Sequence, residues 1–290
     1  MVWYQKTTQV NYLKGIFMKE LTNAEFNKIR EYIKVNFGIS LSDEKKTLVH
    51  SRLKSTLQEL EMQTFSEYFE YLQRDKSGEA LTRFVNKITT NHTFFMRETD
   101  HFDYFRDNVL PYISETYKNQ RDLRLWCAAC SSGEEPVTLQ IIAQEYFKKI
   151  GSGWNTQILA TDISANVLDK AVAALYATES LATLPKNWKL EYFNQVDDQF
   201  SQVADEIRKQ IIYRRHNLMH NLPFKKKFQV IFCRNVMIYF DNHTRDTVVK
   251  KFFDCTEPGG YLFIGHSESI SNSGSGFEYI KPAVYRKPLK

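Results

Sequence analysis

The sequence predicts an α/β protein in which a helical N-terminal domain precedes a doubly wound parallel sheet. In the first 85 or so residues, apolar side chains recur at helical spacing, and no strand pattern is convincing there. From about residue 120, short apolar runs alternate with helical segments, as in parallel sheets whose strands are joined by crossover helices. A chain of 290 residues with 42% hydrophobic content is long enough for both domains.

The expected domain boundaries follow the changes in this pattern. Residues 1–17 match neither the helical nor the strand pattern and are predicted to be an N-terminal extension. Residues 18–88 are the predicted helical domain, and residues 89–290 the predicted α/β domain. Polar, mixed sequence at about 176–216 interrupts the alternation, which indicates an insertion into the sheet domain.

Three groups of apolar side chains predict the helices of the first domain. Asn23 precedes the first group and is the predicted N-cap, and Lys76-Ser77-Gly78 is predicted to separate two helices. The three groups are Phe26, Ile29 and Ile33, then Leu48, Leu53, Leu57 and Leu60, then Phe65, Tyr68, Phe69 and Leu72.

In the α/β domain, continuous apolar runs predict buried strands, and helical spacing predicts the segments between them. Pro136 suits the first turn of one of these helices, and Ser164 is the predicted N-cap of another. The predicted strands are 123–130, 156–161, 228–233 and 260–265. The predicted helices are 136–149, 164–175 and 244–255.

Charge and cysteine content limit the class of protein. The net charge of +5, from 39 basic and 34 acidic residues, is spread along the chain, so it only weakly indicates an acidic partner and does not support nucleic-acid binding. The sequence shows no secretory leader, no apolar stretch of about 18 residues and only four cysteines. We therefore expect a reduced, cytoplasmic protein without membrane insertion.

Cys127-Ala-Ala-Cys130 has the spacing of a redox motif or of half a zinc site. The motif lies in a strand-like run, and no second Cys/His pair at ligand spacing accompanies it. Small buried side chains are therefore the expected role of these cysteines, and no metal site is predicted.

Polar residues follow the predicted strands where an open α/β sheet binds its ligands. Arg234, Asn235 and Tyr239 come after the strand 228–233. The loop 131–136 has one glycine and two carboxylates, which disfavours a pyrophosphate and suits a cationic ligand. Asp162 ends the second strand, where an acidic residue typically accepts hydrogen bonds from ribose.

Each of these acidic residues alone also fits a structural role, at a helix dipole or as a cap. Together they indicate S-adenosylmethionine, which has a positive sulfonium and a ribose but no phosphate.

Six sequence blocks make the indication specific, because they are similar, in order, to the signatures of the CheR family of chemotaxis methyltransferases. The blocks are Thr89–Glu98 with His101-Phe102, Ala128–Pro136, Ala160–Ser164, Asn217-Leu218, Phe232–Phe240 and Gly259–Ser269. The resemblance implies a helical domain followed by a Rossmann-like methyltransferase domain that carries a small antiparallel β subdomain. It also implies methyl transfer from S-adenosylmethionine to glutamate side chains of chemoreceptor cytoplasmic domains.

Matching the blocks position by position implies the site residues. The residues expected at the cofactor are Asn91, Thr93, Arg97, Glu135, Asp162, Asn217, Leu218, Arg234 and Asn235. Because a glutamate carboxylate has a pKa near 4.3, it is already the nucleophile at neutral pH and needs no general base. Arg97 and Arg234 are expected to hold this carboxylate and Tyr239 to donate a hydrogen bond to it. The alternative is that Arg97 pairs with Glu98 or Asp100 and that Tyr239 is ordinary core.

A basic helix face is the predicted docking surface for acidic receptor helices. It consists of Lys45, Lys46, Arg52 and Lys54. In a helix, their spacing would place several of these side chains on one face. A solvated face without a partner is the alternative. Two other functions stay open at this point: a non-catalytic adaptor that keeps the cofactor fold, and a methyltransferase acting on a small molecule or RNA.

Overall fold

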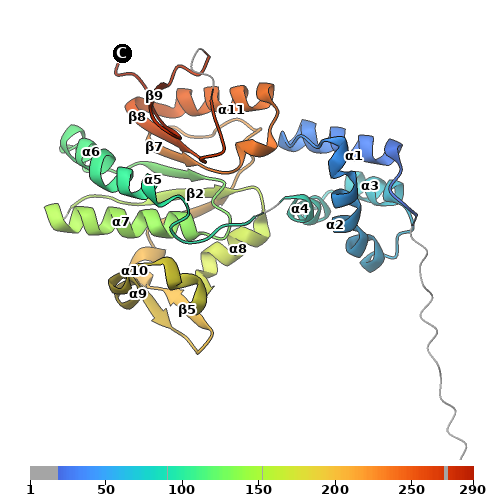
Figure 1. The fold of residues 1–290 in the computed structure, drawn as a ribbon, viewed down its shortest axis with the longest axis horizontal. Coiled ribbons are helices and arrows are strands. Elements are labelled where there is room, and N and C mark those ends of the chain that lie inside the picture. The colour runs from blue at the N-terminus through green and yellow to red at the C-terminus, as the bar shows by residue number, and fades with distance from the viewer. Residues whose placement is uncertain (1–18, 90, 152, 271–273) are drawn as a thin grey trace, which may run out of the picture. The chain divides into compact units, whose positions relative to one another are not determined.

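The computed structural model describes residues 19–89, 91–151, 153–270 and 274–290 (Figure 1). The predicted N-terminal extension, residues 1–17, lies outside the described residues. The chain divides into two compact units. Within the described residues, the first contains Lys19–Ile29 together with Ser42–Ile88, and the second contains Arg30–Leu41 together with the described residues from Thr89 to Lys290.

The first unit is helical, as predicted. Its described elements are the first part of α1 (Asn23–Phe37), η1 (Asp43–Lys45), α2 (Lys46–Glu59), α3 (Phe65–Arg74) and α4 (Glu79–Ile88). The predicted break at residues 76–78 is confirmed, because it falls between α3 and α4. Apolar side chains on one side of each helix are buried, among them Leu53, Tyr68 and Phe84.

The predicted N-cap of α1 was wrong by one residue. Thr22, not Asn23, caps the helix: its Oγ1 accepts a hydrogen bond from the Glu25 N–H at 3.2 Å. The Glu25 carboxylate in turn accepts from the Thr22 N–H at 3.0 Å. This reciprocal arrangement is a capping box, which the Thr-x-x-Glu spacing indicates and the simple preference for Asn does not.

The second unit contains a seven-stranded sheet, within the described residues, in the order β6-β2-β1-β7-β8-β10-β9. The pairs from β6 to β8 are parallel, and β10 pairs antiparallel with both β8 and β9. The strands are β1 (Leu125–Ala128), β2 (Ile158–Asp162), β6 (Ile211–Arg215), β7 (Phe228–Cys233), β8 (Thr256–Ile264), β9 (Glu278–Lys281) and β10 (Val284–Arg286). The four predicted strands correspond to β1, β2, β7 and β8.

Three strands of this sheet were missed, and one of them corrects the sequence interpretation. The sequence pattern predicts that residues 211–215 belong to the insertion, but they form β6, which pairs in parallel with β2 at the edge of the large sheet. As an edge strand, β6 ends in the exposed Arg214 and Arg215, so it lacks the continuous apolar run of a central strand. β9 and β10 were missed because they span only four and three residues.

Helices cover both faces of the large sheet (Figure 1). Side chains from alternate strand positions, such as Cys127 and Phe232, share a core with α5 (Thr99–Tyr104), η2 (Phe105–Val109), α6 (Leu110–Thr116) and α7 (Glu134–Ile150). Trp126 and Ile231 point to the opposite face and pack with α11 (Asn242–Cys255). The N-cap predicted for α8 (Ala165–Ala173) is confirmed, since Ser164 Oγ accepts from the Val167 N–H.

A small antiparallel sheet is inserted between α8 and β6. Its order is β3-β5-β4, with β3 (Leu175–Ala177), β4 (Phe193–Gln195) and β5 (Phe200–Val203). The short helices η3 (Thr178–Thr183), α9 (Lys186–Tyr192) and α10 (Asp205–Arg208) accompany it. The predicted antiparallel β subdomain is therefore present.

Two further features concern the whole described chain. Across the described ranges, none of the helices combines the length and the apolar character needed to cross a membrane. The four cysteines carry free thiols, and Cys127, Cys130 and Cys233 are buried, which confirms the expectation of small buried side chains.

Candidate functional site

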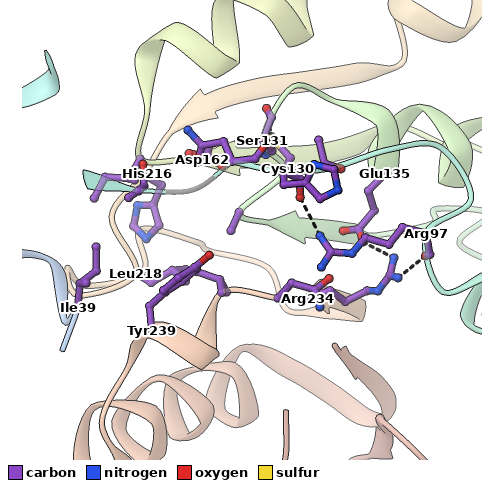
Figure 2. Close-up of a pocket in the computed structure, with 18 of the residues that line it drawn as sticks. Ile39, Arg97, Cys130, Ser131, Glu135, Asp162, His216, Leu218, Arg234 and Tyr239 are labelled. Carbon is purple, nitrogen blue, oxygen red and sulfur yellow. Dashed lines mark hydrogen bonds and ion pairs between the residues drawn. The ribbon is translucent and has the colours of Figure 1, made fainter. Parts of the chain in front are cut away.

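The candidate site lies where the strand order changes direction, between β1 and β7. On one side of this point the sheet continues from β1 to β2 and then β6. On the other side it continues from β7 to β8. Loops at the carboxyl ends of such strands diverge at this point and leave a crevice. A pocket of about 1030 Å³, which includes space open to solvent, occupies this place in the second unit (Figure 2).

All the cofactor and catalytic residues predicted from the sequence line this one pocket. They come from the end of β2, from the loops and first helical turns that follow β1, β6 and β7, and from the segment before α5. The residues are Asn91, Thr93, Arg97, Glu135, Asp162, Asn217, Leu218, Arg234, Asn235 and Tyr239. The large sheet thus brings together residues separated by up to about 150 positions in the chain.

Asp162 is buried at the end of β2, with 7% of its surface exposed. Its Oδ2 accepts a hydrogen bond from the Ser131 N–H at 2.9 Å, and its Oδ1 accepts from the Ser164 N–H at 2.9 Å. Burial raises the pKa of this carboxyl, and the hydrogen bonds from backbone N–H groups only partly offset the rise. Because a carboxylate has about four acceptor positions, Asp162 keeps capacity for ligand hydroxyl donors in the pocket.

Arg234 is the buried electrostatic centre of the site, with a side chain only 2% exposed. Its guanidinium pairs with Glu98 at 2.9 Å. It also pairs with Glu135 at 2.6 Å, and its Nη2 donates to the Arg97 carbonyl (Figure 2). Its plane lies over the Phe102 ring, 5.2 Å from the ring centroid. The prediction that Arg234 holds the incoming carboxylate is therefore not supported, since two carboxylates of the protein already occupy the guanidinium.

Glu98 is a residue of the site that the sequence analysis does not include. It contacts Arg234 and Asn235, two of the residues that line the pocket. Burial alone would raise its pKa, but the charge of Arg234 and hydrogen bonds from Asn235 and Arg234 outweigh this and leave the pKa below its usual value. Its Oε1 accepts from Asn235 Nδ2 at 3.1 Å. Glu98 also has a left-handed backbone, with φ of 57°, which is unusual for a residue other than glycine. The sequence carries no signal for these distant partners.

Arg97 pairs with neither Glu98 nor Asp100, the two partners that the alternative interpretation proposed for it. Glu98 pairs with Arg234, and Asp100 pairs with His266 and Lys281. The Arg97 Nη1 instead donates to the His92 carbonyl at 2.8 Å (Figure 2). A guanidinium has five N–H donors, so this one bond leaves Arg97 able to bind a carboxylate at the pocket.

Asn217 lines the pocket, but its side chain is used in the fold. Its Nδ2 donates to the Asn36 carbonyl at 2.7 Å, and its Oδ1 accepts from the Met219 N–H at 3.0 Å. Leu218 is buried, and its carbonyl accepts from Lys251 Nζ at 3.0 Å. These contacts hold the loop after β6 in place, so Asn217 contributes to the pocket chiefly through its position.

Glu98, His101 and His266 place three potential ligand atoms within 4.8 Å of one another beside the pocket. The Glu98 oxygen nearest to His101, at 3.4 Å, is the same Oε2 that accepts from the Arg234 guanidinium. A divalent ion there would face this guanidinium in a buried setting, so the group is unfavourable for a metal. Burial, followed by the charge of Arg234, lowers the pKa of His101 to about 4.

The predicted docking residues do not form one uncommitted basic face in the first unit. Lys46 Nζ donates to Asn23 Oδ1 at 2.7 Å, and Arg52 donates to the Ile88 carbonyl. Lys45 and Lys54 are exposed. Of the four, Lys45 and Lys54 are therefore the better candidates for contact with a partner.

Comparison with known proteins assigns this architecture to a family. The domain described as "CheR methyltransferase, SAM binding domain" matches residues 91–285, and "CheR methyltransferase, all-alpha domain" matches residues 24–89. The chain belongs to the CheR methyltransferase family. S-adenosylmethionine is accordingly its cofactor.

Relatives within the CheR family match almost the whole chain. "Chemotaxis protein methyltransferase" of Borreliella burgdorferi is 41% identical over 92% of this chain and 95% of its own length. "Chemotaxis protein methyltransferase 2" of Vibrio cholerae is 34% identical over 93% and 95%, respectively. "Chemotaxis protein methyltransferase" of Salmonella typhimurium is 32% identical over 91% and 90%.

The loop after β1 fits the CheR cofactor and does not suit a pyrophosphate. The N–H groups of Ala129 and Cys130 both donate to the Thr161 carbonyl, at 2.8 and 2.9 Å, and the Ser131 N–H donates to Asp162. In a phosphate-binding loop such N–H groups would point at the ligand. Here these N–H groups donate instead to acceptors at the end of β2. The nearby carboxylates of Glu135 and Asp162 suit a nucleoside that bears a positively charged sulfur.

Proposed function

We propose that this chain transfers methyl groups from S-adenosylmethionine to glutamate side chains on the cytoplasmic helices of chemoreceptors, and that it does so in the cytoplasm. The observation that carries the proposal is a pocket that lacks a phosphate cradle and is lined by two carboxylates, Glu135 and Asp162, and by the Arg97 guanidinium. Membership of the CheR family and the printed names of the relatives support it.

For the cofactor, the proposed roles follow the geometry of each side chain. Asp162 accepts hydrogen bonds from the ribose, and Glu135 provides negative charge at the methionine end. Leu218 and the backbone around Asn217 and Asn235 form the walls of the pocket. When bound, S-adenosylmethionine supplies an electrophilic methyl group on a positively charged sulfur. Asn91 and Thr93 complete the proposed cofactor site, which they line together with these residues.

For the acceptor glutamate, the proposed role of the pocket residues is to orient its carboxylate. A glutamate side chain is ionised at neutral pH, because its pKa is near 4.3, so no residue has to remove a proton. Arg97 and Tyr239 orient this carboxylate, and positioning of two reactants can contribute several kcal/mol to rate enhancement. Arg234 is proposed to act indirectly, because its ion pairs fix Glu135, which lines the pocket, and the neighbouring Glu98.

The deciding experiment is methyl transfer from radiolabelled S-adenosylmethionine to receptor cytoplasmic fragments. We expect label on the fragment that alkali releases as methanol, since carboxyl methyl esters are labile to base. A fragment with Gln in place of its Glu residues is the control and should take no label. Binding of S-adenosylhomocysteine without any transfer would favour the adaptor function, and alkali-stable label would favour another substrate class.

Asp162→Asn is expected to weaken binding of S-adenosylhomocysteine by about tenfold, because the neutral amide loses a charged acceptor for hydroxyl donors. Isothermal titration calorimetry measures this change. Asp169→Asn on the exposed side of α8 makes the same substitution seven residues later and should leave the Kd unchanged. An unchanged Kd in Asp162→Asn would contradict the ribose assignment.

Lys45→Glu combined with Lys54→Glu is expected to raise the KM for receptor fragments about tenfold at low salt, since reversed charge repels an acidic helix. The Kd for S-adenosylhomocysteine should not change. Lys28→Glu combined with Lys76→Glu alters the same total charge at other exposed positions of the first unit and is the control. Equal effects of the two double variants would indicate general electrostatics rather than a docking face.

A further inference from the structure

A buried carboxylate lies just outside the pocket, in the turn that follows β8. Glu268 is only 8% exposed, although it follows the strand by four residues. Glu268 is not among the residues that line the pocket. A buried carboxylate is costly unless hydrogen bonds satisfy it, so the partners of Glu268 indicate what it does.

Those partners are backbone N–H groups from two separate loops. Glu268 Oε2 accepts from the Asn235 N–H at 3.0 Å and from the Gly265 N–H at 2.5 Å. Its Oε1 accepts from the Ile238 N–H at 3.1 Å. Burial raises the pKa of Glu268, and these backbone hydrogen bonds partly offset the rise. One carboxylate therefore ties the turn after β8 to the loop after β7.

The loop after β7 has a backbone conformation that needs such support. Asn235 has φ of 58°, a left-handed conformation that costs free energy in a residue with a side chain. Gly265 packs against this residue so closely that a Cβ at Gly265 would lie 2.9 Å from the Asn235 backbone nitrogen. Glu268 and Gly265 thus both contact Asn235, although neither of them lines the pocket.

The same loop presents four residues to the pocket, Val236 among them. Arg234, Asn235 and Tyr239 all line it, and Tyr239 ends the short helix η4 (Met237–Tyr239). Ile238, whose N–H bonds to Glu268, lies within that helix. A shift of this loop would therefore disturb the hydrogen bond between Asn235 and Glu98 and, at the same time, displace the ring of Tyr239.

We propose that Glu268 is a positioning residue, which holds the Arg234–Tyr239 loop in the conformation that binds the cofactor and orients the acceptor. The cofactor part of this inference rests on membership of the CheR family, and the acceptor part rests on the proposed function. Glu268 itself touches neither reactant.

Glu268→Gln tests the proposal, because it keeps the shape of the side chain but turns one acceptor into a donor that faces a backbone N–H. We expect the Kd for S-adenosylhomocysteine to rise about tenfold, and kcat with saturating S-adenosylmethionine and receptor fragment to fall about tenfold. Calorimetry gives the Kd and the fraction of binding-competent protein, so both values refer to folded molecules.

Glu257→Gln is the matched control at the opposite end of β8, where Glu257 accepts from Arg124 at 3.0 Å. Both variants are expected to melt at lower temperature, but the control should retain the wild-type Kd and kcat. A Glu268→Gln protein that shows the wild-type Kd and kcat together with a lower melting temperature would overturn the proposal, since the role would then be structural alone.

Glu268→Asp keeps the charge but shortens the side chain by one methylene, so a smaller rise in Kd of about threefold is expected. If Glu268→Gln does not fold, Glu268→Asp becomes the test of the positioning role. An unchanged Kd for S-adenosylhomocysteine in folded Glu268→Asp overturns the proposal. A wild-type chain that binds S-adenosylhomocysteine but methylates no receptor fragment contradicts the proposed function, while the Kd comparison still tests Glu268.

Discussion

Arg97→Ala is expected to lower turnover of receptor fragments by about 10²- to 10³-fold, while the Kd for S-adenosylhomocysteine changes by no more than about threefold. The reason is geometric. Arg97 lines the pocket, and its bond to the His92 carbonyl holds the guanidinium at the loop before α5. Removal of the side chain leaves the acceptor carboxylate without its orienting partner but leaves the acidic cofactor residues in place.

The size of this effect is limited by the charge change during the reaction. The acceptor carboxylate is negative in the ground state and becomes a neutral ester, so a very tight contact with Arg97 would stabilise the ground state more than the transition state. Orientation rather than charge should therefore account for the effect. Arg97→Lys keeps the charge and loses the planar fork of donors, and we expect it to recover only a small part of the activity.

Steady-state kinetics with radiolabelled cofactor and calorimetry with S-adenosylhomocysteine measure the two quantities separately. Arg106→Ala is the control, because Arg106 is an exposed arginine of the same unit that pairs with Asp103 and Asp107. It should retain wild-type turnover. If Arg97→Ala kept most of its activity, the orienting role would have to be abandoned.

The sequence could predict the place of the site because polar residues at the carboxyl ends of parallel strands converge in space. Asp162 at the end of β2 and Arg234 after β7 are 72 residues apart, yet both line the pocket, as the pattern of strands indicates. The contribution of Arg97 could not be derived in this way, since it precedes the sheet. It came from the resemblance to the family signature.

What could not be predicted are the long-range pairings that decide how each side chain is used. Arg234 pairs with Glu98 and Glu135, which lie 136 and 99 residues away in the sequence. Asn217 donates to the Asn36 carbonyl, 181 residues away. A sequence pattern shows which residue types follow a strand but not which backbone carbonyl or carboxylate they will meet. For that reason the sequence predicts Arg234 at the acceptor carboxylate and does not reveal its pairing with Glu98.

Arg234→Met is expected to lower the free energy of unfolding of the second unit by about 3–5 kcal/mol at pH 7. The substitution keeps much of the side-chain volume but leaves Glu98 and Glu135 without a cation in a largely buried site. Denaturant titration followed by tryptophan fluorescence measures this change, because Trp126, Trp154 and Trp188 all lie in the second unit. Arg124→Met is the control: Arg124 pairs with Glu257 but is 21% exposed, so a loss of only about 1 kcal/mol is expected.

Neutralising both carboxylates as well, with Glu98→Gln and Glu135→Gln added to Arg234→Met, should restore a large part of the lost stability. The reason is that most of the cost of breaking a buried ion pair comes from the charge left behind rather than from the attraction lost. A triple variant as unstable as Arg234→Met alone would show that the guanidinium acts through packing on Phe102 and its bond to the Arg97 carbonyl.

The pH dependence provides an independent check on the same pair. In the wild type the pKa of Glu98 is lowered, so its stabilising contribution is present above its unfolded pKa and is lost as the pH falls through the folded pKa. In Arg234→Met burial is no longer opposed by the guanidinium charge, so the pKa of Glu98 should rise above its unfolded value and protonation should stabilise the folded state. The difference in unfolding free energy between the two proteins should therefore narrow from pH 7 to pH 5. A constant difference over that range would mean that Arg234 does not compensate the charge of Glu98.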